Sequence, residues 1–172
     1  MNLQSTDFEL FGLPKQFVQD RTRIDMRWKE LQREAHPDKF AAHGPAAQRI
    51  AMQWSVRINE AYQRLKNPLK RASYLCELHG APINAENNTV MPVDFLEQQM
   101  HWREALDEAK NSDDLNKILL ESKFFQNAQL LKIEQTLDGE IDFQTASQQV
   151  RSLMFIERFA GEVATRIDQL AP

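Results

Sequence analysis

Apolar residues recur at helical spacing along almost the whole chain, and this periodicity restricts the protein to an all-helical fold. The clearest run is Ala47, Ala51, Trp54, Ile58, Ala61 and Leu65. No segment shows the sustained alternation of β-branched residues that is typical of strands. Only residues 79–92, which are rich in Gly, Pro and Asn, lack periodicity. We therefore predict an all-α protein in two parts joined by a linker.

Helix-breaking residues set the predicted limits of the parts. We predict a first domain at residues 1–80, a linker at 81–92 and a second domain at 93–172. The first domain is expected to hold an antiparallel pair of helices with short flanking helices. One helix of the pair begins at Asp20 and stops at Pro37, and the other runs from Pro45 to Asn67. The flanking helices are predicted at 7–11 and within 69–80.

The second domain is predicted to contain three long helices, over 94–110, 113–137 and 143–170, separated at Asn111-Ser112 and Asp138-Gly139. The middle helix carries apolar residues on two nearly opposite faces. One face holds Leu115, Leu119, Ile133 and Leu137, and the other holds Leu120, Phe124 and Leu131. A helix with two apolar faces is expected to have a neighbour on each side, so we predict a three-helix bundle.

The net charge of −4 conceals two halves of opposite sign. Residues 1–80 carry a net charge of +4, and residues 81–172 carry −8. Much of the positive charge lies on the helix after Asp20, as Arg21, Arg23, Arg27, Lys29 and Arg33. This division favours two surfaces with different partners.

Several functional classes are disfavoured by composition. No window reaches the roughly 18 apolar residues that a membrane span needs, and the N-terminus lacks the pattern of a signal peptide, so we expect a cytoplasmic protein without a membrane partner. The single cysteine, Cys76, cannot form an internal disulfide and is expected to be a small buried residue. We expect no metal, no cofactor and no nucleic acid.

The tripeptide His36-Pro37-Asp38 stands where the charged helix stops. Pro37 lacks an amide hydrogen and pushes His36 toward extended backbone. Taken alone, the tripeptide could be a simple helix stop, with the imidazole beside the negative end of the helix dipole. It could also present an imidazole and a carboxylate to a partner.

Two other interpretations use the same residues. A metalloenzyme could recruit Asp38 and His43, but His79 and His101 lie far along the chain and no HxxxH pattern is present. A helix-turn-helix DNA binder would place the basic helix in a groove of DNA. The chain is acidic overall, and the segment after that helix is too long for a tight turn.

The order of motifs resembles that of a J domain. DFELFGLP is followed by the basic helix, by HPDKF and by INEAYQRLKNPLKRASYL, over about the first 80 residues. The resemblance implies docking on a DnaK-type chaperone and stimulation of its ATP hydrolysis, with His36, Pro37 and Asp38 as the trigger. It makes Arg21, Arg23, Arg27, Lys29 and Arg33 candidate contacts to an acidic surface. A rigid proline loop would present the trigger side chains at little ordering cost.

Neither a Gly/Phe-rich tract nor a cysteine-rich module follows the first domain, which argues against a general DnaJ. Instead, a short linker leads to an acidic helical domain that begins DFLEQQMHWREALDE, and this layout, over nearly the entire chain, resembles the HscB family. This resemblance implies a co-chaperone, not an enzyme, that binds the iron–sulfur scaffold protein IscU and delivers it to the DnaK-type chaperone HscA for iron–sulfur cluster assembly. An alternative is a J-like helical adaptor or structural protein whose second domain binds a different client or only dimerises.

Helical-wheel positions on the second domain separate a core stripe from an outer strip. Phe95, Trp102, Leu106 and Ala109 form the expected core stripe of the helix from Asp94. Phe155 and Phe159 are placed away from the core line of the last helix, formed by Ala146, Val150 and Ala160. The resemblance implies a scaffold-binding patch of Leu96, Met100, Glu104, Glu108 and Phe155. Glu97 and His101 depart from the pattern of the family.

Overall fold

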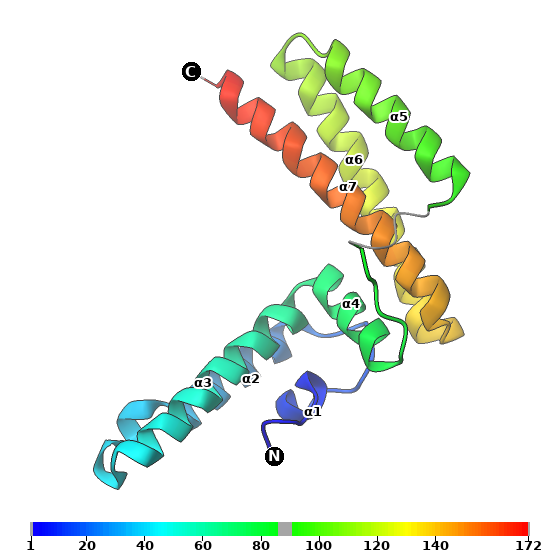
Figure 1. Ribbon diagram of the computed structural model, residues 1–172. Coiled ribbons are helices and arrows are strands. Elements are labelled where there is room, and N and C mark those ends of the chain that lie inside the picture. The colour runs from blue at the N-terminus through cyan, green and yellow to red at the C-terminus, as the bar shows by residue number, and fades with distance from the viewer. Residues whose placement is uncertain (1, 86–90, 172) are drawn as a thin grey trace. The chain divides into compact units, whose positions relative to one another are not determined.

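The computed structural model describes residues 2–85 and 91–171, and every regular element in these ranges is a helix (Figure 1). The predicted all-α fold is confirmed. The chain forms two compact units, Met1–Leu75 and Cys76–Pro172. The limits predicted from the sequence, 1–80, 81–92 and 93–172, remain predictions. Residues 86–90 of the predicted linker lie outside the described ranges.

The first helix, α1 (Asp7–Phe11), begins and ends where the sequence predicts. The Thr6 hydroxyl accepts a hydrogen bond from the Glu9 amide at 3.2 Å, and the Glu9 carboxylate accepts one from the Thr6 amide at 3.1 Å. This reciprocal capping box satisfies two amides that the first turn leaves unpaired. Gly12 ends the helix in the left-handed region at φ 63°.

The long helices α2 (Arg21–Glu34) and α3 (Pro45–Lys66) form the predicted pair. Asp20 caps α2 by accepting a hydrogen bond from the Thr22 amide at 2.9 Å. The segment between the two helices is the 3₁₀ helix η1 (Pro37–His43), where the sequence predicted only a loop. Proline at the first position of this helix supplies the required φ and needs no amide partner.

Contacts along the seam show that α2 and α3 run antiparallel, as predicted. Trp28, at the middle of α2, stacks on Tyr62 near the end of α3, with ring centroids 4.7 Å apart. Further along α2, the Gln32 amide donates to the backbone oxygen of Ser55 at 3.3 Å. Figure 1 shows the two helices lying side by side along their length.

A buried ion-pair network fixes α1 against α3. Asp7 is fully buried, and its carboxylate lies 2.7 Å from Arg57 and 2.6 Å from Arg64, both on α3. The hydrogen bond from Arg64 to Asp7 raises the pKa of the Arg64 guanidinium. The Tyr74 hydroxyl accepts a hydrogen bond from the Asp7 amide at 3.0 Å. A buried carboxylate with several partners avoids the penalty of an unpaired buried charge.

The last short helix of the first half, α4 (Pro68–Leu78), lies across the division between the two units. Cys76 on α4 is fully buried, as predicted, and burial raises the pKa of its thiol to about 11. In the segment that follows, the ring of His79 stacks on Phe143 with centroids 3.7 Å apart. Both residues of this stacked pair belong to the C-terminal unit.

Three long helices form the predicted bundle of the C-terminal unit. The sequence placed a break at Asp138-Gly139, but the backbone there continues as a π-helical turn, and the chain turns at Ile141 with φ 54°. Asp142 then caps the last helix by accepting a hydrogen bond from the Thr145 amide at 3.1 Å. The elements are α5 (Val93–Glu108), α6 (Ser112–Glu134), η2 (Gln135–Glu140) and α7 (Phe143–Leu170).

The bundle core is built around aromatic rings. Trp102 stacks on Phe159 at 5.2 Å and meets Phe125 edge-on at 5.2 Å. The sequence placed Phe159 away from the core line of α7, and this prediction is wrong, because α7 turns Phe159 onto Trp102. The buried cluster contains Trp102, Leu106, Leu115, Ile118, Ile156, Phe159 and Val163.

Only one of the two apolar faces predicted for α6 is covered. Leu115 and Ile133 are buried, whereas Leu120, Phe124 and Leu131 are 73%, 72% and 66% exposed. The prediction that each face has a neighbour is therefore wrong. In a three-helix bundle both neighbours contact one broad stripe of each helix, so the opposite face stays open.

Candidate functional site

The predicted trigger lies at the exposed end of the α2–α3 pair. His36 has extended backbone, φ −63° and ψ 127°, and Pro37 begins η1 directly after it. The His36 side chain is 56% exposed and the Asp38 side chain 91% exposed. The structure therefore presents an imidazole and a carboxylate together to solvent, on a short backbone segment with defined helical geometry.

A local hydrogen bond orients the imidazole. Nδ1 of His36 accepts a hydrogen bond from the Asp38 amide at 3.2 Å and lies 3.6 Å from the Asp38 carboxylate. Because Nδ1 is used as an acceptor, the neutral ring carries its proton on Nε2. The exposed edge of the ring then offers a donor, and the carboxylate beside it offers acceptors.

The basic residues of α2 differ in their pairing. Arg21 lies 2.9 Å from Asp25, and this hydrogen bond raises the pKa of Arg21 and lowers that of Asp25. Arg27 lies 3.1 Å from Glu30. Within the described ranges no ion pair forms at the exposed residues Arg23, Lys29 and Arg33.

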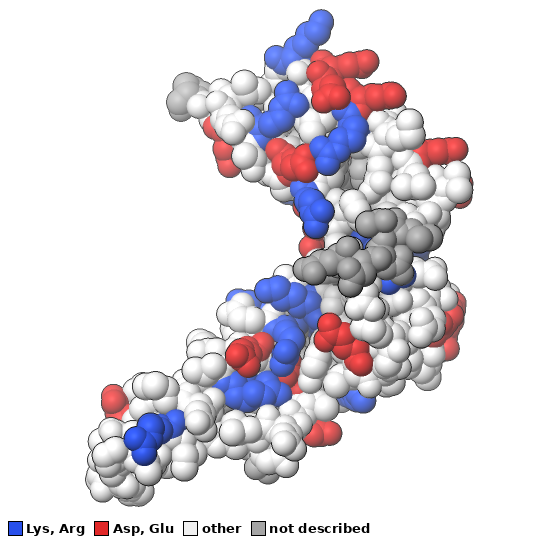
Figure 2. All heavy atoms as spheres, viewed as in Figure 1, with Lys and Arg blue, Asp and Glu red and all other residues white. Residues whose placement is uncertain are grey.

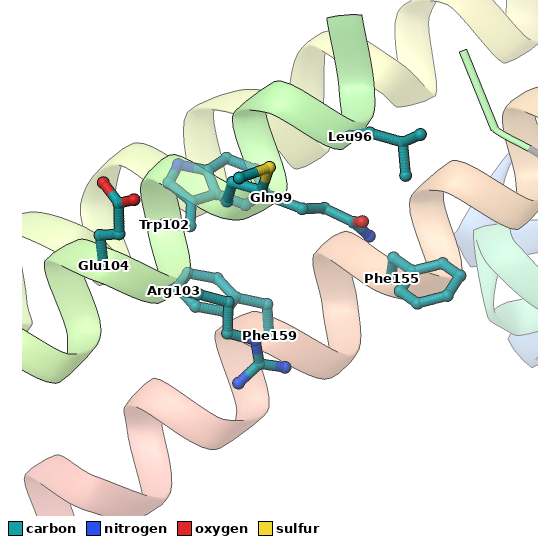
Figure 3. Close-up of a pocket in the computed structure, with 8 residues that line it drawn as sticks. Leu96, Gln99, Trp102, Arg103, Glu104, Phe155 and Phe159 are labelled. Carbon is teal, nitrogen blue, oxygen red and sulfur yellow. The ribbon is translucent and has the colours of Figure 1, made fainter. Parts of the chain in front are cut away.

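The predicted scaffold-binding patch lies on a groove between α5 and α7 in the C-terminal unit. Leu96 and Phe155 lie on facing helices, with Gln99 extending between them (Figure 3). The groove is open to solvent and has a volume of about 590 Å³. Its lining comprises Leu96, Gln99, Met100, Trp102, Arg103, Glu104, Phe155 and Phe159.

Four of the five predicted patch residues line this groove, and Leu96 and Met100 are 43% and 65% exposed. Phe155 is half-buried. Glu108, the fifth, is exposed one turn beyond Glu104 on α5 and does not line it. The two departures from the family pattern, Glu97 and His101, are also exposed on α5 and outside the lining.

Sequence reasoning did not place Arg103 or Phe159 in the groove. Arg103 forms a bidentate pair with Glu162 at 2.5 and 3.1 Å, which raises the pKa of Arg103 and lowers that of Glu162. The pair holds the guanidinium 5.7 Å from the ring centroid of Phe159. The position of Phe159 one turn after Phe155 is the sequence signal that could have identified this part of the site.

Charge is unevenly distributed around the groove. On α7, the Arg158 guanidinium lies 5.6 Å from the ring centroid of Phe155. On α5, Glu97, Glu104 and Glu108 are exposed. Figure 2 shows Asp and Glu side chains over the α5 side of this unit. A partner of this surface would meet an apolar groove with carboxylates along α5.

Neither a metal centre nor a membrane span is evident in the part of the chain that the structure describes. No group of three or more His, Cys, Asp or Glu side chains there could hold a metal ion. Among the described helices, none is long and apolar enough to cross a membrane.

Comparisons with known proteins cover both units. Residues 91–164 match the family model described as the HSCB C-terminal oligomerisation domain. The co-chaperone protein HscB homolog of Burkholderia multivorans is 47% identical over 99% of this chain and 98% of its own length. The homolog of Burkholderia thailandensis is 46% identical over the same shares.

Two solved structures are similar to this chain. The chaperone HscB from Vibrio cholerae aligns with a TM-score of 0.83 and 33% identity, over 97% of this chain and 100% of its own. Human co-chaperone protein HscB aligns with a TM-score of 0.90 over 96% of this chain and 84% of its own. Its identity of 24% supports the fold alone.

An exposed His-Pro-Asp segment between two antiparallel helices, followed by a helical C-terminal unit, defines a J-domain co-chaperone. The relatives and the family model then identify the particular group. The chain belongs to the HscB co-chaperone family.

Proposed function

We propose that this co-chaperone has no catalytic chemistry of its own and joins two partners. The N-terminal unit binds an HscA-like DnaK-type chaperone and stimulates its ATP hydrolysis. The C-terminal unit binds an IscU-like iron–sulfur scaffold protein and delivers it to that chaperone during iron–sulfur cluster maturation. The observation that carries the proposal is the joint exposure of His36 and Asp38 at one end of the α2–α3 pair.

The trigger acts by presenting fixed polar groups. Pro37 and the hydrogen bond from the Asp38 amide to His36 limit the backbone before any partner binds. The chaperone then orders few additional degrees of freedom when it contacts the imidazole and the carboxylate, so less binding free energy is lost. His36, Pro37 and Asp38 are therefore the expected centre of the chaperone contact.

The basic residues of α2 are proposed to guide this contact. Arg21, Arg23, Arg27, Lys29 and Arg33 all remain candidates. Arg21 and Arg27 already pair with carboxylates on the same helix, so their charges are partly neutralised. Arg23, Lys29 and Arg33 are expected to contribute most to the attraction of an acidic surface.

The groove between α5 and α7 is proposed as the scaffold site. Leu96, Met100 and Phe155 supply apolar contact area, and Glu104 and Glu108 supply charge beside it. Clusters of large apolar side chains on the surface of small proteins commonly mark binding sites. A scaffold segment with an apolar centre and basic residues facing α5 would fit this surface.

The proposal is tested by measuring single-turnover ATP hydrolysis by the DnaK-type chaperone with and without the full-length chain and the scaffold. We expect the chain to raise the rate, and the scaffold to raise it further because both partners are held together. No increase with the chain alone would overturn the chaperone half of the proposal. Scaffold binding measured separately by calorimetry tests the other half.

Salt dependence provides a prediction about the basic helix. Exposed charges are screened over about 8 to 10 Å near physiological ionic strength, so the association rate with the chaperone should fall as salt rises. Replacing Arg23 and Arg33 by Gln should slow association and weaken its salt dependence. The matched variant, with Arg21 and Arg27 both replaced by Gln, should have a smaller effect, because these two residues already pair with Asp25 and Glu30. Stopped-flow rates that do not change with salt would contradict the prediction.

We also propose that the C-terminal unit mediates self-association. The family model that matches residues 91–164 is described as an oligomerisation domain. The uncovered apolar face of α6 lies within those residues.

A further inference from the structure

The outward face of α6 carries an apolar stripe, defined here as Leu120, Phe124 and Leu131. At about 100° per residue the three positions fall within about 40° of one line. The stripe extends over about 16 Å of the helix at 1.5 Å per residue. Each side chain is at least 66% exposed. None of the three lines the groove between α5 and α7.

Packing prevents α6 from burying this stripe by rotation. Leu115, Ile118 and Ile133 hold the opposite side of α6 in the bundle interior at 1%, 8% and 0% exposure. Within the described part of the chain, Phe124 has one aromatic contact, an edge-on approach to Phe125 with centroids 6.1 Å apart. Three large apolar side chains therefore remain in water unless another chain covers them.

Charge around the stripe favours a copy of the same chain as that partner. The charged residues that flank it on α6 are nearly balanced, whereas residues 81–172 as a whole carry −8. A strongly acidic or basic partner would find no complementary charge, and two identical surfaces would not repel each other. The charged residues beside or in line with the stripe are Asp113, Lys117, Glu121, Lys123, Lys132 and Glu134.

We propose that two copies of this chain associate through the stripe, with their α6 helices antiparallel; this assignment rests on the self-association proposed above. Leu120 and Leu131 lie equally far from the point between Phe125 and Gln126. A two-fold axis at that point places Leu120 of one copy against Leu131 of the other. Phe124 then lies close to the axis and faces its own counterpart, as in an isologous interface.

The area available limits the strength of this contact. Interfaces of stable complexes bury about 800 Å² on each partner, which is more than three side chains supply. We therefore expect a reversible dimer with a dissociation constant on the order of 10 to 100 µM. Association should be visible at high protein concentration and lost on dilution.

Sedimentation velocity of the full-length chain over a range of concentrations tests the proposal. We expect Phe124→Asp and Phe124→Lys each to weaken self-association at least tenfold, because each places two like charges beside the axis. A mixture of the two variants should associate again, because the charges are then opposite. The matched control Ile141→Asp changes another apolar residue of the same unit, 65% exposed, and should behave as the unchanged chain.

The possible outcomes distinguish a failure of self-association from a failure of its assignment to the stripe. A chain that stays monomeric up to millimolar concentration overturns self-association. If the unchanged chain dimerises and either Phe124 variant also remains dimeric, only the assignment to the stripe is overturned. Two dissociated variants that fail to associate when mixed overturn the antiparallel arrangement. A monomeric chain whose scaffold binding falls with Phe124→Asp assigns the stripe to the scaffold and overturns the proposal. Unchanged melting temperatures confirm that the variants are folded.

Discussion

Replacing Asp38 by Asn is expected to abolish stimulation of the chaperone's ATPase while leaving the fold intact. The carboxylate is 91% exposed, and the hydrogen bond to His36 comes from the backbone amide, so the substitution disturbs neither packing nor the turn. The free energy of unfolding should change by no more than about 0.5 kcal/mol. Asn keeps one acceptor oxygen, but it loses the negative charge and replaces the second carboxylate oxygen with an NH2 donor, so the partner no longer meets the carboxylate that it is proposed to recognise.

Single-turnover ATP hydrolysis by the DnaK-type chaperone measures this effect. With Asp38→Asn the rate should return to that of the chaperone alone. Glu34→Gln is the matched control, because Glu34 is an exposed carboxylate at the end of α2 and the change of charge is the same. Full stimulation by Asp38→Asn, or equal loss with Glu34→Gln, would contradict the role of Asp38 as trigger.

Helix positions could be predicted from the sequence because their causes are local. Asp20 caps α2, Gly12 ends α1, and Asp142 caps α7. Each signal acts within a few residues and does not depend on the rest of the fold. Asp138-Gly139 misled the prediction because a π-helical turn continues through it, and the chain turns only at Ile141.

Features that depend on distant parts of the chain could not be predicted. Asp7 opens α1 and looks like an ordinary acidic residue of a first turn, yet it is buried against Arg57 and Arg64. Its environment depends on how α1 packs against α3, which no local pattern specifies.

Only part of the groove could be predicted, because its lining also depends on how two distant helices pack. Leu96 and Met100 could be placed by the helical wheel of α5, because Trp102 fixes which side of that helix faces the core. Phe159 was misplaced because the rotation of α7 is set by Trp102 on another helix. The resemblance to the family nevertheless predicted Phe155 and Leu96 as members of one patch, and both residues line the groove.

Truncating the groove residues together should separate scaffold binding from stability. The variant replaces Leu96, Met100 and Phe155 by Ala. If the three are central anchors, scaffold binding should weaken by at least about 2 kcal/mol, near thirtyfold, as truncation of interface hot spots does. Leu96 and Met100 are exposed, so the cost in stability should come mainly from half-buried Phe155 and stay well below that of a core truncation.

The matched control applies the same truncation to Leu120, Phe124 and Leu131, the other exposed apolar cluster of the C-terminal unit. Calorimetric titration of the scaffold at micromolar protein, together with a thermal melt of each variant, distinguishes the outcomes. Weak binding by the groove variant alone, with a melting temperature close to that of the unchanged chain, assigns the scaffold to the groove. Intact binding with a collapsed melt would mean that Leu96, Met100 and Phe155 only seal the bundle, because core truncations cost several kcal/mol through the cavities that they leave. Equal loss of binding in both variants would contradict the assignment of the scaffold to the groove.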